Sequence, residues 1–240
     1  MILKVSIGCL FLFLYVISYH KMKKKIVLFI LFILPLACYL FFASGINHFG
    51  KLPMITKQVP DFGNWKSMNN EKVTLNNKIT ILSFPGKDLI KNQGNYFNLT
   101  EQIYNKNKTF TDFQFVLIVP ESSEKEARVL ITKLGGITDV TGWHVLFTSD
   151  GELQNFYNSL KLKGKLDQFL GSKFTHIIDK KRNLRGRNDK KDYKEGYDSF
   201  SPSDLHNEMN DDVKIILAEY RFALKINNNK LKPLEKKKLE

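Results

Sequence analysis

Two apolar stretches decide the fold: residues 78–84 read KITILSF, and residues 113–119 read FQFVLIV. Both are short, rich in β-branched and aromatic residues, and nearly free of charge, which is typical of strands buried on both faces of a sheet. Pro85 and Pro120 end the two stretches. Strands of this kind belong to α/β proteins, in which helices cover a sheet with parallel strands.

Helical patterns alternate with these strands along the chain. Residues 122–134 form an amphipathic helix that begins at a pair of serines, and residues 89–106 and 150–160 carry apolar side chains at helical spacing. Further strands are expected over 72–75, 143–148, 174–179 and 184–187, and a closing helix over 201–224. The order β-β-α-β-α-β-α-β-β-α predicts an α/β, thioredoxin-like fold with a central mixed sheet flanked by helices.

The N-terminal part predicts a membrane anchor. Residues 26–43 read IVLFILFILPLACYLFFA and carry no charge, which is about the length that crosses a bilayer as a helix. A shorter apolar run over 5–18 and a lysine cluster precede it. Lysines of this kind stay on the cytoplasmic side. The following domain is therefore expected on the far side, whether the chain starts at Met1 or Met22 and crosses once or twice.

The cysteines limit the chemistry of the domain. Cys9 and Cys38 both lie in apolar segments, and no cysteine follows them. The sequence LPLAC ending at Cys38 hints at a lipoprotein cleavage box, but Pro35 stands where a branched apolar residue is expected, so an uncleaved anchor is favoured. The domain thus offers no disulfide, no thiol nucleophile and no thiolate metal ligand.

The charge is concentrated at the two ends of the chain. The formal net charge is +13, but five lysines and no acids precede Lys51, and six lysines and two glutamates follow Arg221. Between these positions 26 basic residues face 22 acidic ones. Basic ends fit membrane topology and a solvated tail better than a nucleic-acid surface, so no nucleic-acid partner is expected.

The domain boundaries follow from these patterns. We expect a possible first apolar segment with the lysine cluster over 1–25, a transmembrane anchor over 26–43, a linker over 44–58, a thioredoxin-like domain over 59–224 and a disordered tail over 225–240.

Several short stretches of the sequence resemble the Sco/SenC family of membrane-anchored thioredoxin-fold proteins. They are the Pro60-Asp61-Phe62 opening, the strand over 79–84, the stretch GWHVLFT over 142–148, and the strand that ends at Asp179 before a basic turn. The resemblance covers about residues 59–221, and the preceding anchor adds to it.

This sequence departs from the family at its metal site. The resemblance implies copper binding through a CxxxC pair after the first buried strand and a distal histidine before a later strand, since soft thiolates suit Cu(I). Here Leu89 and Gln93 stand at the thiol positions, and the distal histidine falls near Gly171 or Ser172. Phe174 occupies the region of the thioredoxin cis-proline. All three copper ligands are thus expected to be missing.

Other polar residues give no pattern that points to a site. His176 and His144 lie within strands and are expected to be core or edge histidines, and His206 and Glu208 are expected to be solvated. The basic run over 180–194 is interleaved with Asp and is read mainly as an exposed hairpin, with contact to anionic headgroups or an acidic partner as the alternative. We assign no catalytic, cofactor-binding or metal residue and expect no cofactor.

The sequence therefore predicts a non-enzymatic binding or assembly module. The Lys-, Asn- and Ile-rich composition with five arginines indicates an AT-rich bacterial genome, so we expect an inner-membrane protein that faces the periplasm. A respiratory-chain or other envelope protein is the expected partner, by analogy with the family. The alternative is copper handling for oxidase assembly, with Met54, Met68 or Met209 and a histidine as substitute ligands.

Overall fold

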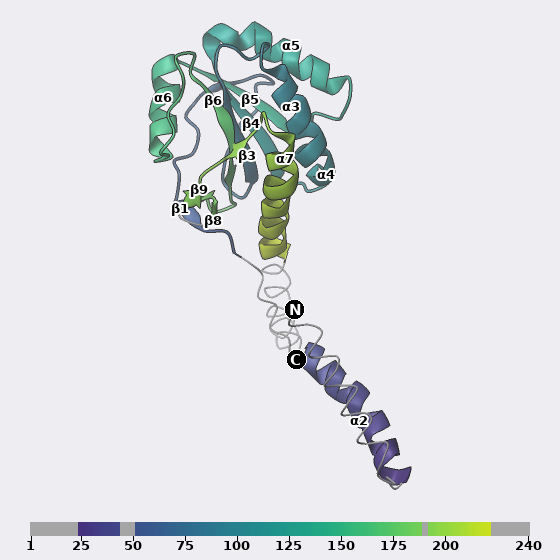
Figure 1. The fold of residues 1–240 in the computed structure, drawn as a ribbon. Helices are drawn as coiled ribbons and strands as arrows, with labels where there is room; N and C mark the ends of the chain where they lie inside the picture. The colour runs from purple at the N-terminus through teal and green to yellow at the C-terminus, as the bar shows by residue number, and fades with distance from the viewer. Residues whose placement is uncertain (1–23, 44–50, 189–191, 222–240) are drawn as a thin grey trace, which may run out of the picture. The chain divides into compact units, whose positions relative to one another are not determined.

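The computed structural model describes residues 24–43, 51–188 and 192–221 (Figure 1). The chain divides into two compact units, residues 1–48 and 49–240, and each is described by itself. Most of the expected first apolar segment and lysine cluster, and the whole tail over 225–240, lie outside the described residues.

The first unit contains helix α2 (Lys24–Ala43), which covers the segment expected to be an anchor. Large apolar side chains along it are exposed, among them Phe29, Leu31, Phe32 and Tyr39. Within the part of the chain that the structure describes, no helix meets the length and apolarity that a membrane crossing requires.

The second unit is built on a mixed eight-stranded sheet. The strands are β1 (Met54–Thr56), β2 (Lys66–Ser67), β3 (Ile79–Pro85), β4 (Phe113–Pro120), β5 (Trp143–Thr148), β6 (Gly171–Ile178), β7 (Leu184–Arg185) and β10 (Tyr197–Asp198). Their order is β1-β7-β6-β3-β4-β5-β2, and β10 pairs with β6. Strands β3, β4 and β5 are parallel, whereas β6 runs antiparallel to β3. A small second sheet joins β8 (Arg187–Asn188) and β9 (Tyr193–Lys194).

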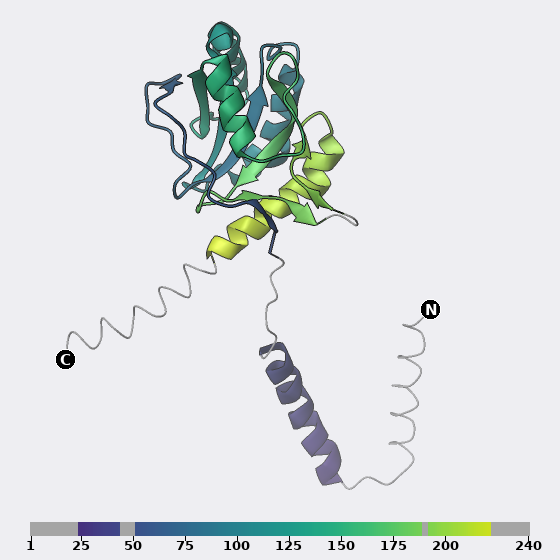
Figure 2. The same ribbon diagram turned by 90° about the vertical axis from the view of Figure 1, so that its left-hand side faces the viewer.

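Helices cover both faces of the sheet (Figures 1 and 2). Their bounds are α3 (Gln93–Leu99), continued by η1 (Thr100–Tyr104) and α4 (Asn105–Asn107), then η2 (Glu121–Ser123), α5 (Glu124–Gly135), α6 (Asp150–Ser159), and α7 (Pro202–Asp204), continued by η3 (Leu205–Met209) and further helix to 221. Helix α6 packs on one face, and the others supply the core of the opposite face. This βαβ unit followed by an antiparallel ββα unit confirms the thioredoxin-like prediction.

The two buried strands explain why their sequences are continuously apolar. Every residue of β3 and β4 is buried. In β3, Ile79 and Ile81 enter one core, whereas Leu82 and Phe84 enter the other. Because successive side chains alternate between faces and both faces are covered, no position in these strands is left for a solvated residue.

The structure corrects two predictions at the N-terminal side of the domain. Residues 72–75 form no strand, because the Asp61 carboxylate accepts from the Leu75 amide at 2.8 Å and from the Thr74 hydroxyl and so holds this segment as a loop. The segment assigned to the linker instead forms β1, which pairs with β7, and Leu52 is buried beside it. The packed domain therefore begins before residue 59.

The basic run is also less exposed than predicted. Residues 183–186 are buried, and β7 lies between β1 and β6. The Arg185 side chain, 7% exposed, bonds to the Asp179 carboxylate at 2.9 Å, to Glu219 at 3.0 Å and to the Leu52 carbonyl oxygen at 2.8 Å. One guanidinium thus ties the edge of the sheet to the N-terminal strand and to the C-terminal helix, with its charge matched by two carboxylates.

Replacing Arg185 by leucine should destabilise the protein strongly. The substitution leaves the Asp179 carboxylate, 3% exposed, without its cation. A buried charge that loses its partner costs about 3–5 kcal/mol of unfolding free energy. Urea titration of the full chain, followed by the fluorescence of Trp65 and the buried Trp143, measures this loss.

Lys214→Ala is the matched control for this experiment. Lys214 and Asp211 form an ion pair at 2.9 Å in which both side chains are more than half exposed. Its loss should change the unfolding free energy by no more than about 0.5 kcal/mol. Equal, small effects of R185L and K214A would show that Arg185 does not hold these elements together.

Candidate functional site

The three positions at which the family resemblance implies copper ligands do not form a metal site. Leu89 is fully buried in the core beneath α3 and α5. Gln93 lies at the start of α3, and its side-chain oxygen accepts from the Lys133 ammonium at 2.8 Å. A buried leucine and a glutamine already bonded to a lysine supply no soft ligand, so the residues present do not fit Cu(I).

The position of the distal histidine is closed by backbone packing. Gly171 pairs with Pro85, where β6 meets the end of β3. A β-carbon at Gly171 would lie 3.1 Å from an Asp167 carboxylate oxygen and 3.2 Å from the Pro85 carbonyl oxygen. The adjacent Gly86 has φ +68°, and a β-carbon there would lie 2.5 Å from the Gly171 nitrogen. The neighbouring Ser172 hydroxyl accepts from the Phe174 amide at 3.1 Å.

The three methionines considered as substitute ligands are not brought together. Met54 is exposed on β1, at one edge of the sheet, and Met68 follows β2, at the other edge. Met209 is fully buried in the core formed with the C-terminal helix. These methionines cannot share one ion.

The remaining polar candidates are engaged in local contacts. His144 on β5 lies 2.6 Å from a Glu71 carboxylate oxygen. His206 is exposed, and its Nδ1 atom lies 3.0 Å from the Gln102 side-chain oxygen. Glu208, half-buried, accepts from the Lys194 ammonium at 2.8 Å. Within the described residues, none of these three side chains belongs to a group that could hold a metal ion.

His176 differs from His144 and His206 because its unpaired ring nitrogen is buried. The side chain is 2% exposed, which confirms that it is a core histidine. Its Nδ1 atom lies 2.9 Å from the Glu195 carbonyl oxygen, and since a carbonyl only accepts, Nδ1 carries the proton. Nε2 of the neutral ring is then an acceptor, and it has no hydrogen-bond partner among the described residues.

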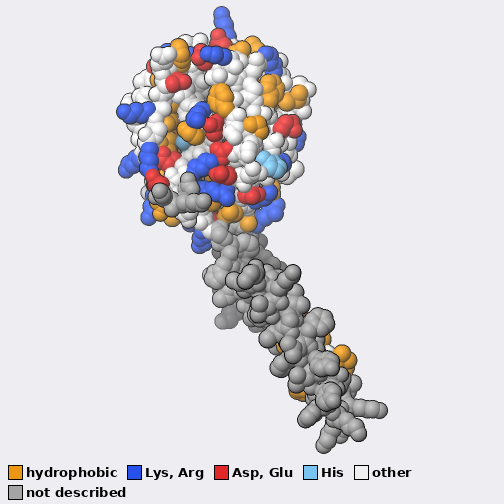
Figure 3. Space-filling model, viewed as in Figure 1, with side chains coloured by type: hydrophobic (Ala, Val, Ile, Leu, Met, Phe, Trp, Pro, Cys, Tyr) orange, Lys and Arg blue, Asp and Glu red, His pale blue; other side chains and the backbone are white. Residues whose placement is uncertain are grey.

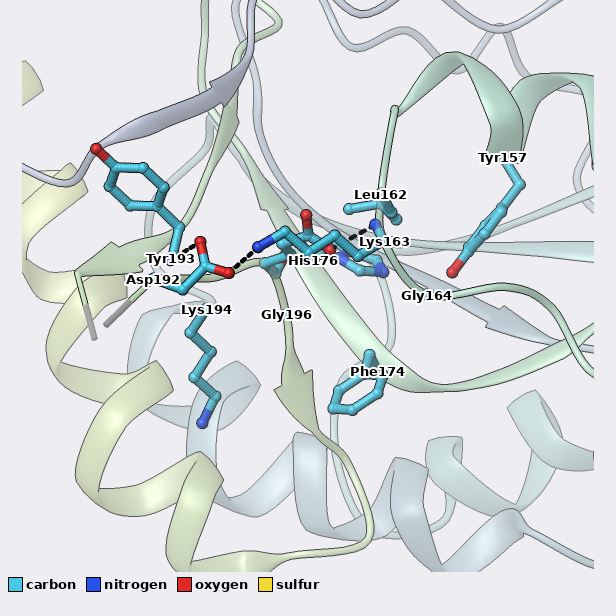
Figure 4. A pocket seen from close by; sticks show the side chains of 11 residues that line it. Tyr157, Leu162, Lys163, Gly164, Phe174, His176, Asp192, Tyr193, Lys194 and Gly196 are labelled. Atoms are coloured by element: carbon cyan, nitrogen blue, oxygen red, sulfur yellow. Dashed lines mark hydrogen bonds and ion pairs between the residues drawn. The ribbon is translucent and has the colours of Figure 1, made fainter. Parts of the chain in front are cut away.

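His176 is also one of the residues that line a cavity of about 230 Å³ (Figure 4). It forms between the end of α6, strand β6 and the segment over residues 192–196. The lining residues are Tyr157 from α6, Leu162, Lys163 and Gly164 after it, Phe174 and His176 from β6, and residues 192–196. Gly196 closes one side of the imidazole, because a β-carbon there would lie 2.8 Å from its Nδ1 and Cε1 atoms. The Nε2 atom itself is buried.

Burial controls the protonation of both polar rings in this cavity. Desolvation lowers the pKa of His176 to about 4, and the hydrogen bond to the Glu195 carbonyl opposes this only partly, so the ring is neutral at pH 7. Desolvation likewise raises the pKa of the Tyr157 hydroxyl, which stays protonated.

The sequence could have indicated only part of this site. The alternation Phe174, His176, Ile178 places the histidine on the face that α6 covers. The segments that shape the cavity come from residues 162–164 and 192–196, and no local signal in the sequence predicts that they lie beside His176 on β6.

The fold is thioredoxin-like and similar to that of Sco proteins. Similar solved structures include BsSco, a Sco-family cytochrome c oxidase assembly protein, at 10% identity and TM-score 0.47, covering 62% of this chain and 88% of that one. Copper-bound ScoI of Arabidopsis thaliana has 17% identity and TM-score 0.44, covering 65% and 98%. A thiol:disulfide interchange protein DsbE from Chlorobium tepidum has 18% identity and TM-score 0.44, covering 70% and 98%.

No family profile and no curated protein sequence matches the chain. Identities this low describe the fold and nothing of the chemistry, which has to be argued from the residues themselves.

The depressed pKa of His176 predicts a pH-dependent stability. The unfolded chain takes up a proton at the ordinary pKa of 6.5, whereas the folded ring takes it up only near 4. Stability is therefore fully present above pH 6.5 and is lost as pH falls toward 4. Relative to His176→Phe, the wild type should lose about 2–3 kcal/mol of unfolding free energy between pH 7 and pH 4.5, as measured by urea titrations.

Tyr157→Phe is the control, because it changes the same cavity without removing a group that titrates in this range. Its stability curve should run parallel to that of the wild type. If the curve of H176F also runs parallel, the histidine is not held neutral by burial.

Proposed function

We propose that this chain is a membrane-anchored, extracytoplasmic binding or assembly module, and not an enzyme. Its thioredoxin-like domain keeps the architecture that Sco proteins share but lacks their redox and copper ligands. The observation that carries the proposal is the chemistry at the family's ligand positions: Leu89 is core, Gln93 is bonded to Lys133, and Gly171 is packed against backbone and carboxylate. A domain with no cysteine also has no thiol to oxidise or to bind Cu(I).

The N-terminal segment supports the anchoring part of this proposal. Residues 26–43 carry no charge, and apolar side chains from Phe29 to Tyr39 are exposed along α2. An exposed apolar surface of this kind is costly in water and favourable in hydrocarbon. The lysine cluster over 21–25 favours a cytoplasmic start of the segment, which would put the domain at the periplasmic face of a bacterial inner membrane.

An exposed aromatic pair supports a partner-binding role for one edge of the domain. Phe169 is 40% exposed, and its carbonyl oxygen accepts from the Lys87 amide just after β3. Phe200 is 50% exposed and follows Ser199, whose amide donates to the Lys173 carbonyl oxygen at the start of β6. Both rings thus border the end of the β3–β6 pair, where exposed aromatic side chains favour contact with another protein.

The distribution of charge supports a protein partner over a nucleic acid. On the face shown in Figure 3, lysines and arginines lie interspersed with acids. Lys194, Arg185 and Arg187, within or near the basic run, each contact a carboxylate. By family analogy the partner would be a respiratory-chain component or another envelope protein.

Site-specific photo-crosslinking of the full chain in bacterial membranes tests this proposal. A benzophenone amino acid at position 200 or 169 should give a discrete crosslink to one membrane protein. The same amino acid at Val129, exposed on α5, is the matched control and should give none. Identical patterns at all three positions, or no crosslink at positions 169 and 200, would contradict a partner at this edge.

A further inference from the structure

One end of the sheet carries cations that have no carboxylate partner. Strand β3 begins at this end, β6 ends there and β7 begins there, as their pairing shows. Among the residues that the structure describes, five basic side chains at this end form no ion pair, although three of them are exposed and two half-buried. We call them the basic end, and they are Lys57, Lys78, Lys181, Arg182 and Arg221.

Backbone hydrogen bonds join two other segments to the turn between β6 and β7. The Val59 amide donates to the Arg182 carbonyl oxygen at 2.8 Å, and the Asn77 amide donates to the Lys180 carbonyl oxygen at 3.1 Å. Each of these donors lies within two residues of a lysine of the basic end. Segments that are far apart in the sequence therefore bring their cations together.

The last helix ends at the same place. The Arg221 guanidinium lies 4.5 Å from the centroid of the Phe110 ring, and the Lys180 ammonium lies 5.4 Å from the centroid of the Tyr220 ring. Both rings are only partly buried against the core. Cations beside partly exposed aromatic rings, tyrosine above all, are typical of surfaces at the boundary between a membrane and water.

The turn between β6 and β7 presents two cations of the basic end. The buried Asp179 carboxylate accepts from the Lys181 amide at 2.9 Å, so the backbone is held while the lysine side chain is exposed. Arg182 has φ +61°, a left-handed conformation that glycine or asparagine adopts more readily. The geometry of the turn does not call for an arginine, which favours a role for its side chain.

The acids that lie among these segments are already engaged. Two carboxylates pair with the Arg185 guanidinium, one pairs with the Lys180 ammonium, and one accepts from the loop over 74–76. They belong, in that order, to Asp179 and Glu219, Asp112, and Asp61. Anions that neutralise the basic end therefore have to come from outside the described part of the chain.

The covalent structure favours a membrane as the source of these anions. The Leu52 carbonyl oxygen and the Glu219 carboxylate both accept from the Arg185 guanidinium, so the domain begins beside the end of its last helix (Figures 1 and 2). Residues 44–50 precede the domain, and a linker of that length spans at most about 25 Å. After Arg221 the sequence adds six lysines and two glutamates. Headgroups of an anchoring membrane would be within reach at all times, unlike a free acidic protein.

We propose that the basic end binds the anionic phospholipid headgroups of the membrane that anchors the chain. The inference rests on the proposed anchoring and adds to it the binding surface and the class of lipid. Exposed cations attract anions over about one Debye length, which is about 10 Å at 0.1 M salt. Binding should therefore require anionic lipid and should be lost at high salt.

Fluorescence quenching of the full chain in vesicles tests the proposal. In the Cys9→Ser/Cys38→Ser background, a fluorophore is attached at Thr111→Cys or at Ser122→Cys, two exposed positions that flank β4. Thr111 belongs to the end in question, because its carbonyl oxygen accepts from the Lys78 ammonium at 2.9 Å. The vesicles carry a quencher on a few headgroups and consist of phosphatidylcholine, alone or in equal parts with phosphatidylglycerol.

The label at position 111 should be quenched at least about twofold more in the anionic vesicles than in the neutral ones. Raising NaCl to about 1 M shortens the Debye length to about 3 Å and should remove the difference. The label at position 122, at the other end of β4, should give the same signal in both vesicles.

Two double variants supply matched changes of charge. Lys181→Glu with Arg182→Glu reverses two cations of the basic end, and Lys87→Glu with Lys91→Glu reverses two exposed lysines that follow β3 at its other end. Each basic residue near an anionic surface strengthens binding about fivefold, so the first variant should weaken binding at least about tenfold. Its quenching at position 111 should fall to the level in neutral vesicles, and the second variant should behave like the wild type.

A further variant and a flotation assay separate the possible outcomes. Lys57→Glu with Arg221→Glu leaves the turn unchanged and should also abolish the extra quenching. Equal quenching at position 111 in both vesicles, or quenching that neither variant of the basic end lowers, would overturn the proposal in favour of an acidic protein partner. A chain that does not float with neutral vesicles at high salt would refute the anchor instead, and its basic end should still bind anionic vesicles at low salt.

Discussion

The rest of this domain depends on one constraint, the close approach of Gly86, just after β3, to Gly171, the first residue of β6. We call this contact the β3–β6 junction. Gly86 has a left-handed backbone, and its α-carbon faces the Gly171 backbone so closely that a β-carbon would lie 2.5 Å from the Gly171 nitrogen. The Asp167 carboxylate reinforces this turn by accepting from the Gly171 amide at 2.8 Å. The junction pairs Pro85 with Gly171, and a shift in register separates this pair from the regular pairing of Ser83 with Thr175.

At the same junction, this protein differs from the copper chemistry that its resemblance to the Sco/SenC family implies. The region where a distal histidine would stand is filled by backbone and by Asp167. The histidine that β6 does carry, His176, lies within the strand, donates to the Glu195 carbonyl and is one of the residues that line a cavity. The polar groups at this junction and on β6 thus serve local packing and hydrogen bonding.

The sequence predicted those features that depend on local patterns. The strand over 143–148 matches β5, and the helix over 122–134 matches α5, since continuous apolar runs and helical spacing are readable from neighbours in the chain. The very short strands β1 and β2 were missed because two or three residues carry no period and their pairing depends on distant partners.

The burial of charged side chains could not be predicted from the sequence either. Arg185 lies in a basic run that reads as solvated, but its partner Glu219 comes from the last helix. His176 was predicted to be a core or edge histidine, and the structure buries it in the core. Its cavity was not foreseen, because it requires two loops that meet only in the folded chain.

A competition titration of Cu(I) between the full chain and a chromogenic chelator tests the central claim, that the thioredoxin-like domain has kept its fold without the copper site. The titration uses the Cys9→Ser/Cys38→Ser variant, so that the two N-terminal thiols cannot bind the metal. We predict that the protein removes no copper from a chelator of micromolar affinity. Tight uptake of one equivalent would contradict the account and would require a set of soft ligands that the described residues do not bring together.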